Sequence, residues 1–247
     1  MMPALLRLTA TETRLFSREP LDWGFALVLP PLLLAILGAI PSFRVPEEGL
    51  GGLRVIDLYP PIIVAIAITM LALMTLPQRF ATYRDKGVLR RMRITPVRPA
   101  MMLGAQLLLC LMMSLVTLVV VLAVARLVFA VDLPQQVFAY LIAFVLTALT
   151  MLAIGLLVAS LAPTGPAAGV IGTVLLFPLL FLAGLWIPRA SMNDVLLTIS
   201  DFSPLGAGVQ ALQDATAGSW PQLLHVVVLL GWTIICGGLA ARYFRWE

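Results

Sequence analysis

Long apolar runs, separated by short polar segments, constrain the fold of this chain more than any other feature. The sequence of 247 residues is 61% hydrophobic and 11% charged, whereas a soluble domain is about 45–50% apolar and about 25% charged. Backbone polar groups inside a bilayer must pair with each other, so such runs form helices. The sequence therefore predicts one all-α integral membrane domain over residues 1–247, with spans at residues 23–40, 58–76, 100–129, 137–161, 167–187 and 222–241.

The residues before the first predicted span form a separate amphipathic segment. Within residues 3–19, three arginines fall on one side of a helix and three leucines on another. This pattern predicts an interfacial elbow helix that lies along the membrane surface. A solvated cytosolic arm is the alternative, because Glu12 and Glu19 interrupt the apolar side.

The segment 188–220 is too polar to span a membrane, yet it has helix signals. Ser191 followed by Asp194 resembles a capping box, and Ser203-Pro204 resembles an N-cap followed by the first helical position. The sequence predicts two short helices here, re-entrant or extracellular, that end at Gly218.

Basic residues are distributed unevenly between the two sides of the predicted bundle. The side with both termini and the loop 79–98 carries twelve of the 16 lysines and arginines, which leaves four on the opposite side. Cytoplasmic loops carry the excess of such residues. We therefore expect both termini in the cytoplasm, which requires an even number of spans.

Several classes of catalytic site are excluded by composition. The sole lysine, Lys86, is followed by glycine, so the chain has no P-loop. One histidine, His225, is too few for a zinc cluster, and no nucleophile, base and acid form a recognisable triad. We expect no enzyme activity, no catalytic or metal-binding residues and no cofactor bound by this chain. His225, near the outer end of the last span, is interpreted as an interface residue.

Polar side chains inside the spans are few and uncharged. An ion-coupled secondary transporter would need ionisable residues at mid-membrane, and the span interiors have none away from their ends, although this class stays open as an alternative. The polar residues favour hydrogen bonding between helices over a substrate path. The candidates for either role are Gln106, Ser114, Thr117, Thr147 and Thr150.

The longest basic interruption runs from Arg79 to Pro99 and holds seven of the 16 lysines and arginines. Gly87 is expected to break the helix that descends from the second span. After it, three apolar residues share one face of a short helix and three arginines take the others, until Thr95-Pro96 ends the helix. Composition alone leaves two roles open, retention of the loop beside lipid phosphates and docking of a partner.

The run from Tyr83 to Pro96 resembles the signature of ABC-2 type permeases, in which a charged glycine-containing turn, a basic short helix and Thr-Pro precede the third span. Where this family often has glutamate before the glycine, the chain has Asp85 and Lys86. The N-terminal elbow also fits the family. The segments Leu182–Pro188 and Ser203–Leu212 are similar to actinobacterial drug-exporter permeases of the daunorubicin type.

The resemblance implies a multi-pass permease in a bacterial plasma membrane that exports an amphipathic drug-like or lipid-like molecule and so contributes to antibiotic resistance. It implies a dimer, of equal or different permease copies, with nucleotide-binding ATPase subunits that hold ATP and magnesium, and no nucleic acid. A non-transporting membrane scaffold is the further alternative. The resemblance makes residues 80–96 the coupling segment, with contacts from Tyr83, Asp85, Lys86, Gly87, Val88, Leu89, Arg90, Arg91, Met92, Arg93 and Pro96.

Overall fold

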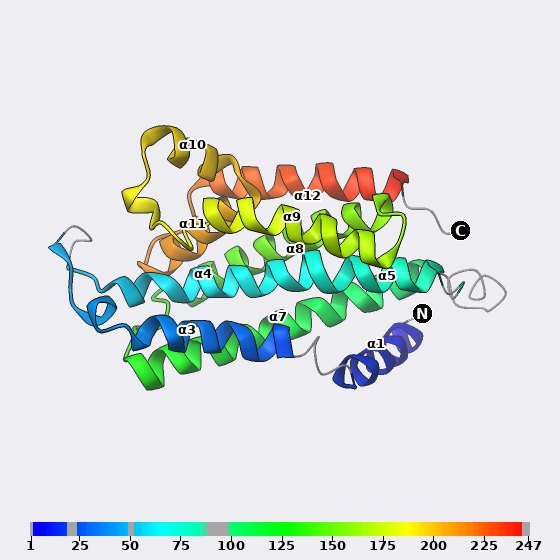
Figure 1. The fold of residues 1–247 in the computed structure, drawn as a ribbon, viewed down its shortest axis with the longest axis horizontal. Helices are drawn as coiled ribbons and strands as arrows, with labels where there is room; N and C mark the ends of the chain where they lie inside the picture. Colours follow the sequence, from blue (N-terminus) through cyan, green and yellow to red (C-terminus); the bar gives the residue numbers. More distant parts are fainter. Residues whose placement is uncertain (1, 19–23, 49–51, 86, 88–98, 244–247) are drawn as a thin grey trace.

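The computed structural model describes residues 2–18, 24–48, 52–85, 87 and 99–243. These residues form an elongated bundle of helices (Figure 1). One end, which we call the terminal end, holds α1 and the end of α12. The other, the loop end, holds residues 40–48 and 52–54 together with α10 and α11. The described residues contain helices and loops but no β-strand, so the predicted all-α fold is confirmed.

The helices follow the apolar runs of the sequence. Helix α1 (Met2–Ser17) precedes a π-helical turn, η1 (Gly24–Val28), which continues into α3 (Leu29–Ala39). A second stretch runs without interruption through α4 (Val55–Met70), the π-helical turn η4 (Leu71–Thr75) and α5 (Leu76–Asp85). The other elements are the 3₁₀ turns η2 (Pro41–Arg44) and η5 (Arg189–Ser191) and the helices α7 (Pro99–Phe129), α8 (Val137–Leu161), α9 (Gly165–Leu182), α10 (Asp194–Phe202), α11 (Pro204–Thr216) and α12 (Leu223–Tyr243).

Five described helical segments are long and apolar enough to cross a bilayer, which needs about 20 residues. They are Val55–Asp85, Met101–Phe129, Val137–Leu161, Gly165–Leu182 and Leu223–Tyr243. The first predicted span, residues 23–40, contains a shorter apolar helix over Ala26–Ala39. The helix that contains the second predicted span, residues 58–76, begins at Val55 and continues past Leu76 to Asp85, as expected of a helix that descends from this span. Gly87 then adopts φ +65°, as expected of the residue that breaks this helix.

The long helix Val55–Asp85 forms the centre of the bundle, and α8 and α9 both approach it closely at η4. A Cβ atom on Gly155 of α8 would lie 2.0 Å from the carbonyl oxygen of Ala72, and one on Gly172 of α9 would lie 2.1 Å from that of Leu73. Small residues at such points let helix backbones meet in a membrane, where apolar burial drives association only weakly.

Helices α10 and α11 meet at 93° and confirm the two short helices predicted before the last span. Ser203 caps α11, because its Oγ accepts the Gly206 N–H at 3.0 Å, and Pro204 opens the helix. The predicted capping box at Ser191 and Asp194 was wrong by two residues: Asn193 is the cap of α10, and its side chain accepts the Leu196 N–H at 2.8 Å. Gly218 ends the pair with φ +88°.

We predict that Gly155→Ala destabilises the fold by about 1–3 kcal/mol, because the added methyl group would overlap backbone that cannot move without shifting η4. Gly237→Ala in α12 is the matched control, since a Cβ there meets nothing within 4 Å. Thermal unfolding of the purified proteins in one detergent would measure both. Equal unfolding temperatures for the two variants would contradict the close approach of α8 to η4.

Candidate functional site

The elbow helix α1 is attached to the last turns of α5 at the terminal end. The Tyr83 hydroxyl donates to Oε2 of Glu12 at 2.9 Å, and Nη1 of Arg79 lies 3.8 Å from the same oxygen. Arg79 also lies over the Phe16 ring, 5.1 Å from its centroid. Glu12, which interrupts the apolar side of α1 in the sequence, is therefore a buried attachment point, at 5% exposure.

The last turn of α5 also contacts the turn between α8 and α9. Nη2 of Arg84 donates to the carbonyl oxygens of Ala162 and Pro163. Oδ2 of Asp85 accepts the N–H of Gly165, the first residue of α9, at 3.4 Å. A displacement of the chain that follows Asp85 would thus act on α1, on the α8–α9 turn and on the start of α9.

Three of the predicted coupling residues are described: Tyr83 and Asp85 in the contacts above, and Gly87 at the end of the helix. The others lie outside the described residues, and their roles stay predictions. They are Lys86, Val88, Leu89, Arg90, Arg91, Met92, Arg93 and Pro96.

Two of the polar residues inside the spans connect neighbouring helices. Oγ1 of Thr117 in α7 lies 2.9 Å from the carbonyl oxygen of Ala26 in η1. Oγ1 of Thr150 in α8 lies 3.0 Å from the carbonyl oxygen of Leu229 and 2.9 Å from Oγ1 of Thr233, both in α12. These are packing contacts between helices.

Among the residues that the structure describes, the other three predicted polar side chains form no hydrogen bond to another helix. Ser114 and Thr147 donate to carbonyl oxygens one turn back in their own helices, at 2.8 and 2.7 Å. Thr147 also packs against Gly208 of α11, where an added Cβ would lie 2.7 Å from its side chain. Gln106 is fully buried, and among the described residues its side-chain amide has no hydrogen-bond partner.

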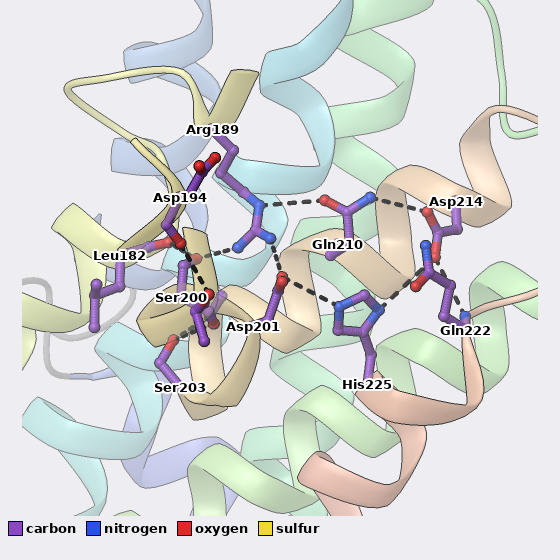
Figure 2. Close-up of polar contacts among 12 residues, drawn as sticks. Leu182, Arg189, Asp194, Ser200, Asp201, Ser203, Gln210, Asp214, Gln222 and His225 are labelled. Carbon is purple, nitrogen blue, oxygen red and sulfur yellow. Dashed lines mark hydrogen bonds and ion pairs between the residues drawn. The ribbon is translucent and has the colours of Figure 1, made fainter. Parts of the chain in front are cut away.

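A cluster of charged and polar side chains fills the loop end between α10, α11 and α12 (Figure 2). We call it the loop-end cluster; its members are Arg189, Ser200, Asp201, Gln210, Asp214 and His225. The guanidinium of Arg189 is central: it pairs with Asp201, donates to the Ser200 hydroxyl and donates from Nε to Oε1 of Gln210 at 3.2 Å. The cluster joins four consecutive elements of the chain, η5, α10, α11 and α12.

His225 belongs to this cluster, so its interpretation as an interface residue was wrong. Only 2% of its surface is exposed. Its Nε2 lies 3.3 Å from Oδ1 of Asp201, and its Nδ1 lies 3.9 Å from Oδ2 of Asp214. The helices α10 and α11 fold over the start of α12 and cover the ring, which no pattern within the last span could indicate.

A weak sequence signal for the cluster does exist. Gln210 and Asp214 are four residues apart on α11, a spacing that puts them on one helix face, and Nε2 of Gln210 donates to Oδ1 of Asp214 at 2.9 Å. The cluster lacks the nucleophile and base arrangement of a hydrolase. Among the described residues, no three His, Cys, Asp or Glu side chains are placed to hold a metal ion. The cluster is therefore a set of ion pairs and hydrogen bonds that hold its elements together.

Two adjoining cavities open beside the cluster, of about 430 and 540 Å³. Leu58 of α4 and Gln213 of α11 line both. The first also contacts Arg189 of the cluster, and the second contacts an ion pair between Arg54 and Asp57, whose charged atoms approach to 2.6 Å. The hydrogen bonds that Arg54 donates to Asp57 raise the pKa of the Arg54 guanidinium, so this guanidinium stays protonated at neutral pH.

Comparison with known protein families identifies the family of this chain. The family model of the ABC-2 type transporter matches residues 3–216, which run from the elbow helix to the end of α11. The chain belongs to the ABC-2 type transporter family. It is therefore a multi-pass transmembrane component of such a transporter and not a catalytic ATPase, in a family that normally works with a nucleotide-binding subunit. No individual curated protein matches the chain.

We predict that Arg189→Met in this ABC-2 protein lowers the free energy of unfolding by about 3 kcal/mol, because it leaves Asp201 without its counter-ion in a mostly buried site. Arg126→Met is the matched control: it removes an ion pair to Asp132 whose side chains are 51% and 92% exposed. Denaturant-induced unfolding in detergent, followed by tryptophan fluorescence, would measure both. The double variant Arg189→Met/Asp201→Asn should recover most of the loss, and no recovery would contradict the charge explanation.

Proposed function

We propose that this ABC-2 protein is the membrane subunit of an ATP-driven exporter that moves an amphipathic drug-like or lipid-like molecule out of a bacterial cell. The family match over residues 3–216 is the observation that supports this proposal most directly. Drug efflux of the daunorubicin type, and a role in antibiotic resistance, rest on the sequence resemblance described above.

The energy for transport would come from a partner. The chain has one lysine, and that lysine is not part of a P-loop. A separate nucleotide-binding subunit would supply ATP hydrolysis and hold the ATP and magnesium, and a second permease copy would complete the transporter. The terminal end, which holds α1 and the ends of α5 and α12, would face the cytoplasm under the positive-inside rule, because most of the basic residues belong to this side in the sequence.

The coupling segment, residues 80–96, would transmit movement of the ATPase to the bundle. Its first residues belong to α5, which continues without a break from α4 and η4. Contacts of Tyr83 with Glu12 and of Arg84 with Ala162 join α5 to α1 and to the α8–α9 turn. A movement of the segment would therefore be passed to the long helix, the elbow and two further spans together.

We predict that Leu89→Asp and Arg91→Glu each insert normally but lose binding to the cognate ATPase subunit, because they alter the apolar and cationic faces of the coupling segment. Matched controls at the loop end carry the same changes: Leu133→Asp, whose side chain is 52% exposed, and Arg126→Glu. Co-purification from cells that express both subunits would measure binding, and stimulation of ATP hydrolysis would measure coupling.

Binding and stimulation that persist in both coupling-segment variants would contradict the coupling role. Loss in all four variants would indicate general misfolding, and would also contradict it. Complex formation with ATP hydrolysis but no movement of any tested substrate would instead support the non-transporting scaffold.

A further inference from the structure

The loop-end cavities have walls whose charges are already compensated. Each nitrogen of the Arg189 guanidinium bonds to a cluster residue. The Arg54 guanidinium bonds to both oxygens of Asp57 and to the carbonyl oxygens of Phe129 and Ala130, at 2.6–3.2 Å. An anionic group that entered would have to displace these contacts and leave a carboxylate unpaired, which is costly.

One polar side chain at the junction of the two cavities is not engaged in this way. Gln213 lines both cavities and is partly exposed to them. No described residue forms a hydrogen bond with its side-chain amide, whereas Gln210, one turn earlier, bridges Arg189 and Asp214. An amide offers both a donor and an acceptor to a ligand and adds no charge.

The remaining surface of the first cavity is mainly apolar. Val55, Leu58 and Ile62 of α4 and Leu197 of α10 line it. Volumes of 430 and 540 Å³ fall in the range of about 300–1,000 Å³ that drug-sized ligands occupy. Apolar walls with few convergent polar groups are the usual composition of such sites.

We propose that the loop-end cavities bind an uncharged amphipathic molecule, with its apolar body against α4 and its hydrogen-bonding group, such as an amide, hydroxyl or carbonyl, at Gln213. Carboxylates, phosphates and ammonium groups are disfavoured because each charged wall residue already has a partner. Arg189 pairs with Asp201 and Arg54 with Asp57. Asp132, which also lines the second cavity, pairs with Arg126 at 2.9 Å. The inference narrows the substrate class of the proposed exporter and rests on that proposal, while the site itself can be tested without transport.

The test uses Leu58→Cys in the full chain, purified without an ATPase and placed in lipid nanodiscs. The native cysteines, Cys110 and Cys236, are buried, so background labelling is low. Three methanethiosulfonates that differ only in their end groups are compared: hydroxyethyl, sulfonatoethyl and trimethylammonioethyl. Val45→Cys, at a loop position that is 60% exposed, provides the reference rate for each reagent.

Relative to Val45→Cys, the uncharged reagent should label Leu58→Cys about tenfold faster than either charged reagent. The charged reagents must lose their hydration shell on entering the cavity, and the charged wall residues, which already have partners, do not replace it. Adding Gln213→Glu should then raise labelling by the cationic reagent about tenfold and lower labelling by the anionic one, because an unpaired carboxylate would face the cavity. Val55→Cys is a second reporter should Leu58→Cys fail to fold.

Equal relative rates for the three reagents would overturn the proposal, since the cavities would then be filled with bulk water and would not discriminate between charged and uncharged groups. Faster labelling by the anionic reagent would also overturn it, since the arginines would then be available. Unchanged labelling rates in the Gln213→Glu variant would contradict the claim that Gln213 binds the ligand's polar group. Selective labelling in a protein that shows no ATP-dependent transport would support the cavity assignment and contradict export; transport with unselective labelling would do the reverse.

Discussion

The close contact of α8 and α9 with the long helix around η4 is the constraint on which the rest of the bundle depends. Lipid tails are as apolar as the side chains, so helices in a membrane gain little from apolar burial alone and associate where their backbones can meet. Gly155 and Gly172 permit this at two adjacent residues of one π-helical turn. The turn itself lies at the point of contact, where a π-helical bulge shifts backbone positions that a regular α-helix would fix.

From this central point, one continuous helix extends to both ends of the molecule. At the terminal end, Tyr83 and Arg84 bind the elbow helix and the α8–α9 turn. At the loop end, the Tyr59 hydroxyl donates to the carbonyl oxygen of Leu185 at 3.3 Å, beside the cavities. A continuous helix with polar contacts at each end provides a physical connection between the proposed coupling segment and the proposed ligand site.

Most of the fold could be predicted from the sequence, because the apolar runs and the strongest local signals act over a few residues. The all-α architecture, the cap at Ser203, the helix break at Gly87 and the end of the short helices at Gly218 needed no tertiary information. The continuation of the second span's helix to Asp85 was expected as well, since Gly87 was predicted to end that helix.

The loop-end cluster could not be found in this way. Its members are supplied by η5, α10, α11 and α12. They meet only because the chain bends by 93° between α10 and α11 and brings both helices against the start of α12. His225 thus looked like a residue at a membrane surface, although its neighbours are carboxylates brought from elsewhere in the chain. The role of Glu12 was hidden for the same reason. In the sequence it only interrupts an amphipathic pattern, because its partners lie about 70 residues away on α5.

The central claim is that ATP hydrolysis by a partner drives movement through this permease. Transport of an uncharged amphipathic fluorophore into proteoliposomes, with the permease and its cognate ATPase subunit reconstituted together, tests it most directly. The account predicts uptake that requires ATP and magnesium, stops when the ATPase is omitted, and persists when an ionophore collapses the proton and sodium gradients. Uptake without the ATPase that disappears with the ionophore would contradict the account and identify an ion-coupled transporter.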